Sequence, residues 1–178
     1  TNTMPPDEWV NTRIFCWFMA LFYFNKLLQI PLVLVNKVCG ISFRKLIEMF
    51  MEVGSSYRNV SEILTFFTEK AMAVHNGDCE YIASRKWLNI WWPADEYIFI
   101  KLCLENELAA FYKESEAIIS GFINKNRLQF SQVLLHDAIE LNKQLIKLPF
   151  NKSDMEISLH HNILEGYHNI LEGRDAMI

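Results

Sequence analysis

The sequence predicts an all-α protein: a single compact domain of seven or eight helices over residues 1–178. Apolar residues recur at spacings of three and four along most of the chain, and strong helix formers dominate its second half. A chain of 178 residues, 51% of them hydrophobic, can also bury a core without disulfides or metals. The expected exception is one short strand near the C-terminus, over residues 155–160, where apolar and polar side chains alternate.

The first expected helix begins near Pro6, where Asp7 and Glu8 favour the positive end of the helix dipole. Residues 14–24 are apolar without interruption, so this helix should be covered on several sides. A membrane-spanning helix needs about 20 mostly apolar residues, and Lys26 would be costly inside a bilayer. We therefore expect a buried helix in place of a membrane segment.

The remaining helices follow from amphipathic spacing, capping residues and helix stops. Pro31 should end or kink the first helix near Gln29. Further helices are expected over residues 31–39 and 42–52, from Asn59 or Ser61 to Asn76, and over residues 94–106, 107–123 and 128–148. A seven-residue repeat at 161–173 predicts a docked terminal helix, because two repeats are too few for a coiled coil.

Composition excludes several classes of function. The net charge is −4 and the 17 Lys and Arg residues are scattered, so a nucleic-acid partner is not expected. The four cysteines are far apart and form no C-x-x-C pair, which indicates free thiols, mostly buried, in a reducing compartment. No secretory signal pattern is present. We therefore expect a cytoplasmic protein.

No catalytic, cofactor-binding or metal-binding residue is predicted. The sequence contains no nucleophile-elbow, zinc-protease, P-loop or dinucleotide-binding motif. His161 and His168 are two helical turns apart, which separates them by about 10 Å, too far for one metal ion. A metal site formed by His160, His161 and His168 is therefore disfavoured, and any other role for them stays open.

The tryptophans are the candidate contact residues. An exposed aromatic platform would bind a ligand or a partner domain, whereas buried aromatic residues serve the core. The sequence favours core or a domain interface, with a ligand-facing surface as the alternative. The candidates are Trp9, Trp87, Trp91 and Trp92.

Three segments carry a family resemblance. The chain opens with Thr1-Asn2-Thr3-Met4, followed by the acidic-Trp start Asp7-Glu8-Trp9-Val10 and the long apolar helix. A Trp-Pro-acidic helix start follows at Trp92-Pro93-Ala94-Asp95-Glu96-Tyr97, and the C-terminus carries Asn162, Tyr167, Leu171, Glu172 and Gly173. Together these segments resemble the region downstream of the catalytic domain in cobalamin-binding radical SAM proteins, often named Fe–S oxidoreductases.

The resemblance implies an accessory C-terminal domain that is not catalytic by itself. The family's C-x-x-x-C-x-x-C loop, which binds a [4Fe–4S] cluster and S-adenosylmethionine, is absent here, as is any cobalamin motif. Those parts would lie upstream of Thr1, in a catalytic domain that would be this chain's partner, so we expect a fragment of a larger protein. Two alternatives stay open: a free-standing helical interaction module and a membrane-surface protein.

Overall fold

A computed structural model describes residues 4–53, 56–87, 89–146 and 156–175. Within these residues the chain forms eight α-helices, one π-helical turn and one antiparallel hairpin, which confirms the all-α class. The elements are α1 (Pro6–Met19), η1 (Ala20–Phe24), α2 (Gln29–Cys39), α3 (Phe43–Glu52), α4 (Arg58–His75), β1 (Ile82–Ser84), β2 (Ile90–Trp92), α5 (Ala94–Leu104), α6 (Leu108–Lys125), α7 (Gln132–Leu145) and α8 (Ile163–Leu171).

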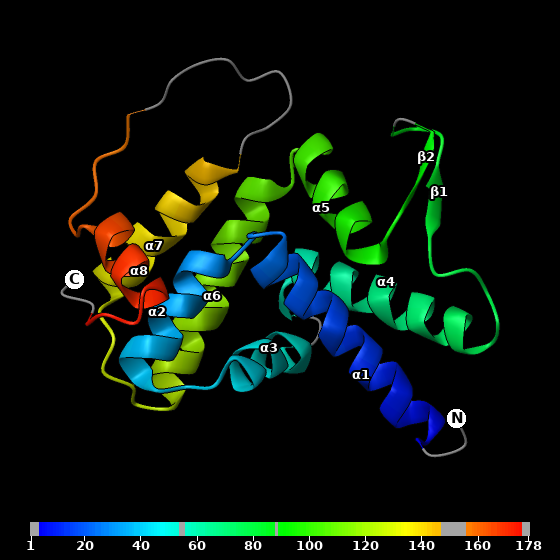
Figure 1. The fold of residues 1–178 in the computed structure, drawn as a ribbon, viewed down its shortest axis with the longest axis horizontal. Helices are drawn as coiled ribbons and strands as arrows, with labels where there is room; N and C mark the ends of the chain where they lie inside the picture. The colour runs from blue at the N-terminus through cyan, green and yellow to red at the C-terminus, as the bar shows by residue number, and fades with distance from the viewer. Residues whose placement is uncertain (1–3, 54–55, 88, 147–155, 176–178) are drawn as a thin grey trace.

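The helices pack in two groups around α6 and η1. Helix α1 packs against α4 and α3, while α2 packs against α7 and α8 (Figure 1). Helix α6 contacts both groups, through α4 on one side and α7 on the other. One cluster of buried apolar residues runs through both groups; its fully buried aromatic members are Phe18, Phe22, Phe50, Phe67, Phe111 and Tyr112.

The first helix ends earlier than its sequence predicts. It continues as the π-helical turn η1 and stops at Phe24, and the chain then bends by 99° into α2. The expected break near Gln29 is present, over residues 25–28, but it precedes Pro31 and does not coincide with that residue. Pro31 lies in the first turn of α2, where a missing backbone N–H is tolerated. Gly40 ends α2 in the left-handed conformation with φ 65°, as expected.

Helix α4 lacks the local cap that the sequence predicts. Neither Asn59 nor Ser61 is its cap; the helix begins at Arg58, and Tyr57 provides no side-chain hydrogen bond. The Glu114 carboxylate of α6 replaces the cap, since it accepts from the backbone N–H groups of Asn59 (3.1 Å) and Val60 (3.2 Å). An anion at the positive end of a helix is stabilising, so this contact fixes α4 on α6.

Helix α7 begins later than expected. Ser131 caps it, accepting from the backbone N–H of Leu134, so the predicted start at Leu128 is wrong. The expected end of this helix, at Leu148 before Pro149, lies outside the described residues.

The strands lie elsewhere than predicted. Residues 156–159 form no strand, and Met155 lies outside the described residues. The hairpin instead joins α4 to α5, with Ala83 opposite Trp91. Three-residue strands are too short to show the alternation that identifies a strand in a sequence.

In the described parts of the chain, no single helix has the length and hydropathy to cross a bilayer. Residues 6–24 and 29–39, which are bent by 99° relative to each other, reach that length and hydropathy only when the two segments are taken together. About half of the apolar residues of this pair are buried in the core, and most of the others are partly buried against it.

Candidate functional site

The hairpin tryptophans divide between the core and the surface. Trp87 is only 5% exposed and lies 4.7 Å from the Tyr97 ring, centroid to centroid. Trp92 donates its indole N–H to the Trp87 carbonyl at 3.2 Å, so these residues hold the hairpin on α5. Trp91 is 63% exposed. Of the three, Trp91 alone presents a large free aromatic surface.

Trp9 makes its aromatic contact elsewhere, away from the hairpin tryptophans. It is half-buried on α1, and its ring packs on His75 at the end of α4, with centroids 5.6 Å apart. Trp9 thus helps to join α1 to α4. Among the described residues, the four tryptophans therefore do not form one aromatic platform.

Two of the three C-terminal histidines share a buried carboxylate. The Asp137 side chain, 2% exposed, accepts from the backbone N–H groups of His160 and His161, both at 2.9 Å. The His161 ring Nδ1 is 2.7 Å away and the His160 ring Nδ1 is 3.3 Å away. Burial alone would raise the pKa of Asp137, but these hydrogen bonds from His161 and His160 lower it below its ordinary value. Asp137 therefore anchors the segment that leads into α8.

His168 is separate from that arrangement. It lies on α8, exposed, beside a different cavity. Across the described ranges, no group of three or more His, Cys, Asp or Glu side chains is arranged to hold a metal ion.

The cysteines differ from the expectation of mostly buried thiols. Cys16 and Cys79 are exposed and Cys39 is half-buried, so only Cys103 fits that interpretation. Burial raises the pKa of the Cys103 thiol to about 11. Cys16 lies on the outer side of α1, where an apolar run in the sequence is covered on fewer sides than predicted.

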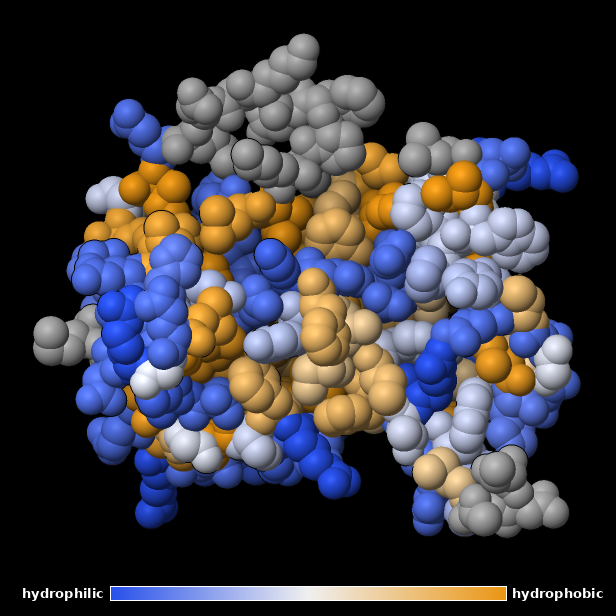
Figure 2. Space-filling model, in the orientation of Figure 1, coloured by the Kyte–Doolittle hydropathy of each residue, from blue (hydrophilic) through white to orange (hydrophobic). Residues whose placement is uncertain are grey.

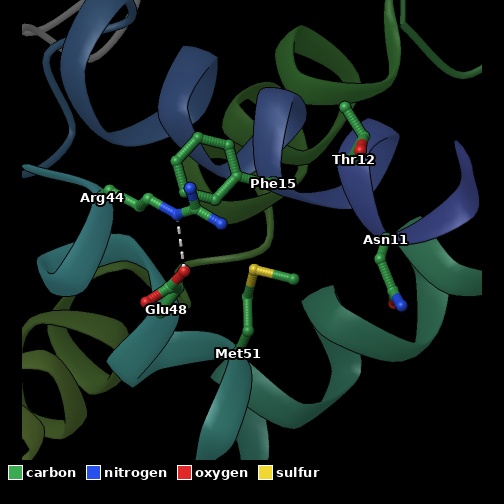
Figure 3. Close-up of a pocket in the computed structure, with 6 residues that line it drawn as sticks. All are labelled: Asn11, Thr12, Phe15, Arg44, Glu48 and Met51. Carbon is green, nitrogen blue, oxygen red and sulfur yellow. Dashed lines mark hydrogen bonds and ion pairs between the residues drawn. The ribbon is translucent and has the colours of Figure 1, made fainter. Parts of the chain in front are cut away.

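The exposed side of α1 lies along two adjoining hollows, which we call the α1 groove. Figure 2 shows an apolar patch near the centre of this face, over α1 and α3. The hollow between α1 and α3 has a volume of about 370 Å³, and Phe15 and Met51 point into it beside the Arg44–Glu48 ion pair (Figure 3). The hollow between α1 and α4 has a volume of about 490 Å³ and shares Asn11 and Met51 with the first.

A third cavity lies at the bend between η1 and α2, and we call it the break cavity. Its volume is about 460 Å³. Its lining combines polar and apolar side chains from α2, α5, α7, α8 and the segments that follow η1 and α7: Asn25, Lys26, Gln29, Ile30, Phe99, Asn142, Leu145, Ile146, Leu164, Tyr167 and His168.

A buried asparagine holds the bend beside this cavity. Asn142 accepts from the backbone N–H of Ile30 at 2.9 Å and donates to the carbonyls of Lys26 (3.0 Å) and Leu27 (2.9 Å). The Tyr112 hydroxyl donates to the Leu27 carbonyl at 2.7 Å and accepts from Asn142 at 3.0 Å. Burial raises the pKa of Tyr112 despite the hydrogen bond from Asn142, so its hydroxyl stays protonated. These bonds satisfy backbone groups that the bend removes from the helical ladder.

Sequence reasoning missed Asn142, Tyr112 and Asp137. The available signal was the polarity of Asn142 and Asp137 at positions on the apolar face of α7, beside Leu134, Leu135, Ala138 and Ile139. A buried polar residue on such a face needs partners, and these partners lie more than 20 residues away in sequence.

Comparison of the chain with protein-family models, curated proteins and solved structures finds no match.

Proposed function

We propose that this chain is an accessory C-terminal helical domain of a radical SAM, cobalamin-binding Fe–S oxidoreductase of the cytoplasm. In this proposal the chain is not catalytic and packs against the upstream catalytic domain of the same polypeptide. That catalytic domain would hold the [4Fe–4S] cluster, S-adenosylmethionine and cobalamin. The proposal rests on the sequence resemblance and on one structural observation, the α1 groove.

The position of the groove supports this role. It begins at Pro6 and Asp7, the first turn of α1, and continues to Phe15. A domain that precedes α1 in the polypeptide would therefore lie next to both hollows. Met72, 52% exposed, and Phe15 offer apolar contact area there, as is typical of surfaces that pack on another domain.

A free-standing interaction module is the second candidate, and the shape of the groove favours it. The exposed side of α1 has α3 on one flank and α4 on the other, an arrangement that accepts an amphipathic helix. The two candidates differ in the occupant: a catalytic domain of the same polypeptide, or a helix from another protein.

The test begins with the reading frame upstream of Thr1. The proposal predicts a C-x-x-x-C-x-x-C motif there, and a reading frame without it would refute the radical SAM assignment. The upstream domain and this chain are then expressed separately and mixed, and their association is measured by analytical ultracentrifugation.

Phe15→Asp and Met72→Asp should each weaken that association about tenfold or more, since each places a charge in a desolvated contact. Val133→Asp is the matched control, because Val133 is similarly exposed, at 45%, on α7 away from the groove. Equal effects of all three substitutions would exclude the groove as the contact surface.

A further inference from the structure

The break cavity has the geometry of a preformed binding site. Asn142 and Tyr112 fix the backbone on one side of it through hydrogen bonds of 2.7 to 3.0 Å. Its volume of about 460 Å³ falls within the range of small-molecule pockets. It shares no lining residue with the α1 groove, so ligand binding in this cavity does not depend on the proposed domain association.

Three polar side chains at the cavity, Lys26, Gln29 and His168, can donate to a ligand, whereas Asn25 donates its side-chain N–H to the Asp95 carboxylate at 2.8 Å. Tyr167 donates its hydroxyl to the side-chain oxygen of Gln29 at 2.8 Å, which leaves the Gln29 amide nitrogen as the group able to bind a ligand. Burial raises the pKa of Tyr167, with a smaller effect of Tyr23, so that this hydroxyl stays protonated. Lys26 and His168, both exposed, add an ammonium group and an imidazole at the rim.

Charge and hydropathy define the ligand further. Among the residues that the structure describes, no carboxylate lines the cavity, although the chain as a whole has a net charge of −4. The rest of the lining is mainly apolar: Ile30, Phe99, Leu145, Ile146 and Leu164. A ligand that matches both parts has one anionic head and an apolar body.

We propose that the break cavity binds a monocarboxylate with an aliphatic chain. The carboxylate contacts the Lys26 ammonium and the Gln29 amide, and the chain packs against Phe99 and Leu164. Lys26 is suited to this contact because it lies in the bend itself, with φ 61°, on backbone that Asn142 holds through the Lys26 carbonyl.

Sodium octanoate is the probe, added to the purified chain and followed by isothermal titration calorimetry and by NMR of the side-chain amides. The ten or so heavy atoms of octanoate, at the efficiency of ordinary drug-sized ligands, correspond to a dissociation constant of about 6 mM. Saturable octanoate binding that shifts the Gln29 amide signal supports the proposal. Octylammonium should bind at least about tenfold more weakly, because it places like charge beside Lys26.

Two substitutions locate the site. Lys26→Met should weaken octanoate binding about tenfold or more, since it removes a charge-assisted contact. Leu145→Trp should weaken it similarly by filling the cavity, and Leu145 is 54% exposed, so the larger side chain can be tolerated. Lys37→Met is the matched control, because Lys37 is an exposed lysine of α2 that does not line the cavity.

Three results would overturn the proposal. They are the absence of saturable octanoate binding, equal effects of Lys26→Met and Lys37→Met, and octylammonium binding as tight as octanoate binding. Circular dichroism of each variant confirms the fold; if Leu145→Trp unfolds the chain, Lys26→Met against Lys37→Met alone decides the location.

Discussion

Asn142 offers the sharpest test of how this fold is held together. Asn142→Leu keeps the volume of the side chain and removes all of its hydrogen bonds. The backbone N–H of Ile30 then loses its partner inside the protein, at a cost of about 1–3 kcal/mol. The Leu27 carbonyl keeps the Tyr112 hydroxyl, while the Lys26 carbonyl loses its bond to Asn142. The loss of these contacts together should lower the free energy of unfolding by about 2–4 kcal/mol.

The assay is thermal and urea denaturation followed by circular dichroism. For a chain of this size the expected loss corresponds to a fall of roughly 4–16 °C in melting temperature. Asn124→Leu is the matched control, because Asn124 is exposed in the last turn of α6 and the substitution changes helix propensity equally. Tyr112→Phe completes a double-mutant cycle, in which a coupling energy of about 0.5–3 kcal/mol is expected. If Asn142→Leu cost no more than Asn124→Leu, the bend would not depend on this network.

Three further results are expected. Asp137→Asn should lower the free energy of unfolding at neutral pH. In denaturation curves, the difference in this free energy between the variant and the unchanged chain should shrink as the pH falls from about 4 through the lowered folded-state pKa of Asp137. A difference that stays constant with pH would contradict this. Glu114→Gln should cost about 1 kcal/mol in thermal unfolding because it removes the charge at the start of α4, whereas Glu116→Gln, also on α6 but away from that helix end, should cost less. In thiol labelling with Ellman's reagent, Cys16 and Cys79 should react in the folded chain and Cys103 only after unfolding; rapid labelling of Cys103 would show that α5 opens readily.

Local signals predicted several helix ends correctly where the capping residue is next to the helix in sequence. Ser42 accepts from the Lys45 N–H at the start of α3, as the sequence predicts. Gly40 and the segment Asn76-Gly77 likewise mark helix ends correctly, since a left-handed residue after a helix is a local requirement.

Distant partners explain the errors at the start of α4 and at the bend, whereas the start of α7 had an available local signal in Ser131. The start of α4 depends on Glu114, more than 50 residues away in sequence, so no local residue could mark it. The bend after η1 depends on Asn142, and Pro31 is compatible with the first turn of α2. The candidate sites also depend on residues that are distant in sequence. The break cavity is lined by residues from several helices, so no local pattern could indicate it. The sequence around each tryptophan likewise did not indicate which side chains it would contact.

The bend after η1 also has a consequence for synthesis on the ribosome. Ile30 and Asn142 are separated by 112 residues, so the contact that fixes the bend cannot form until α7 has been made. At ordinary translation rates this takes roughly 6 to 22 seconds. During that time the nascent chain carries two apolar segments, residues 6–24 and 29–39, that together have the length and composition of a bilayer-spanning segment. Newly made chains should therefore be early clients of ribosome-associated chaperones, which would cover this pair until α7 arrives.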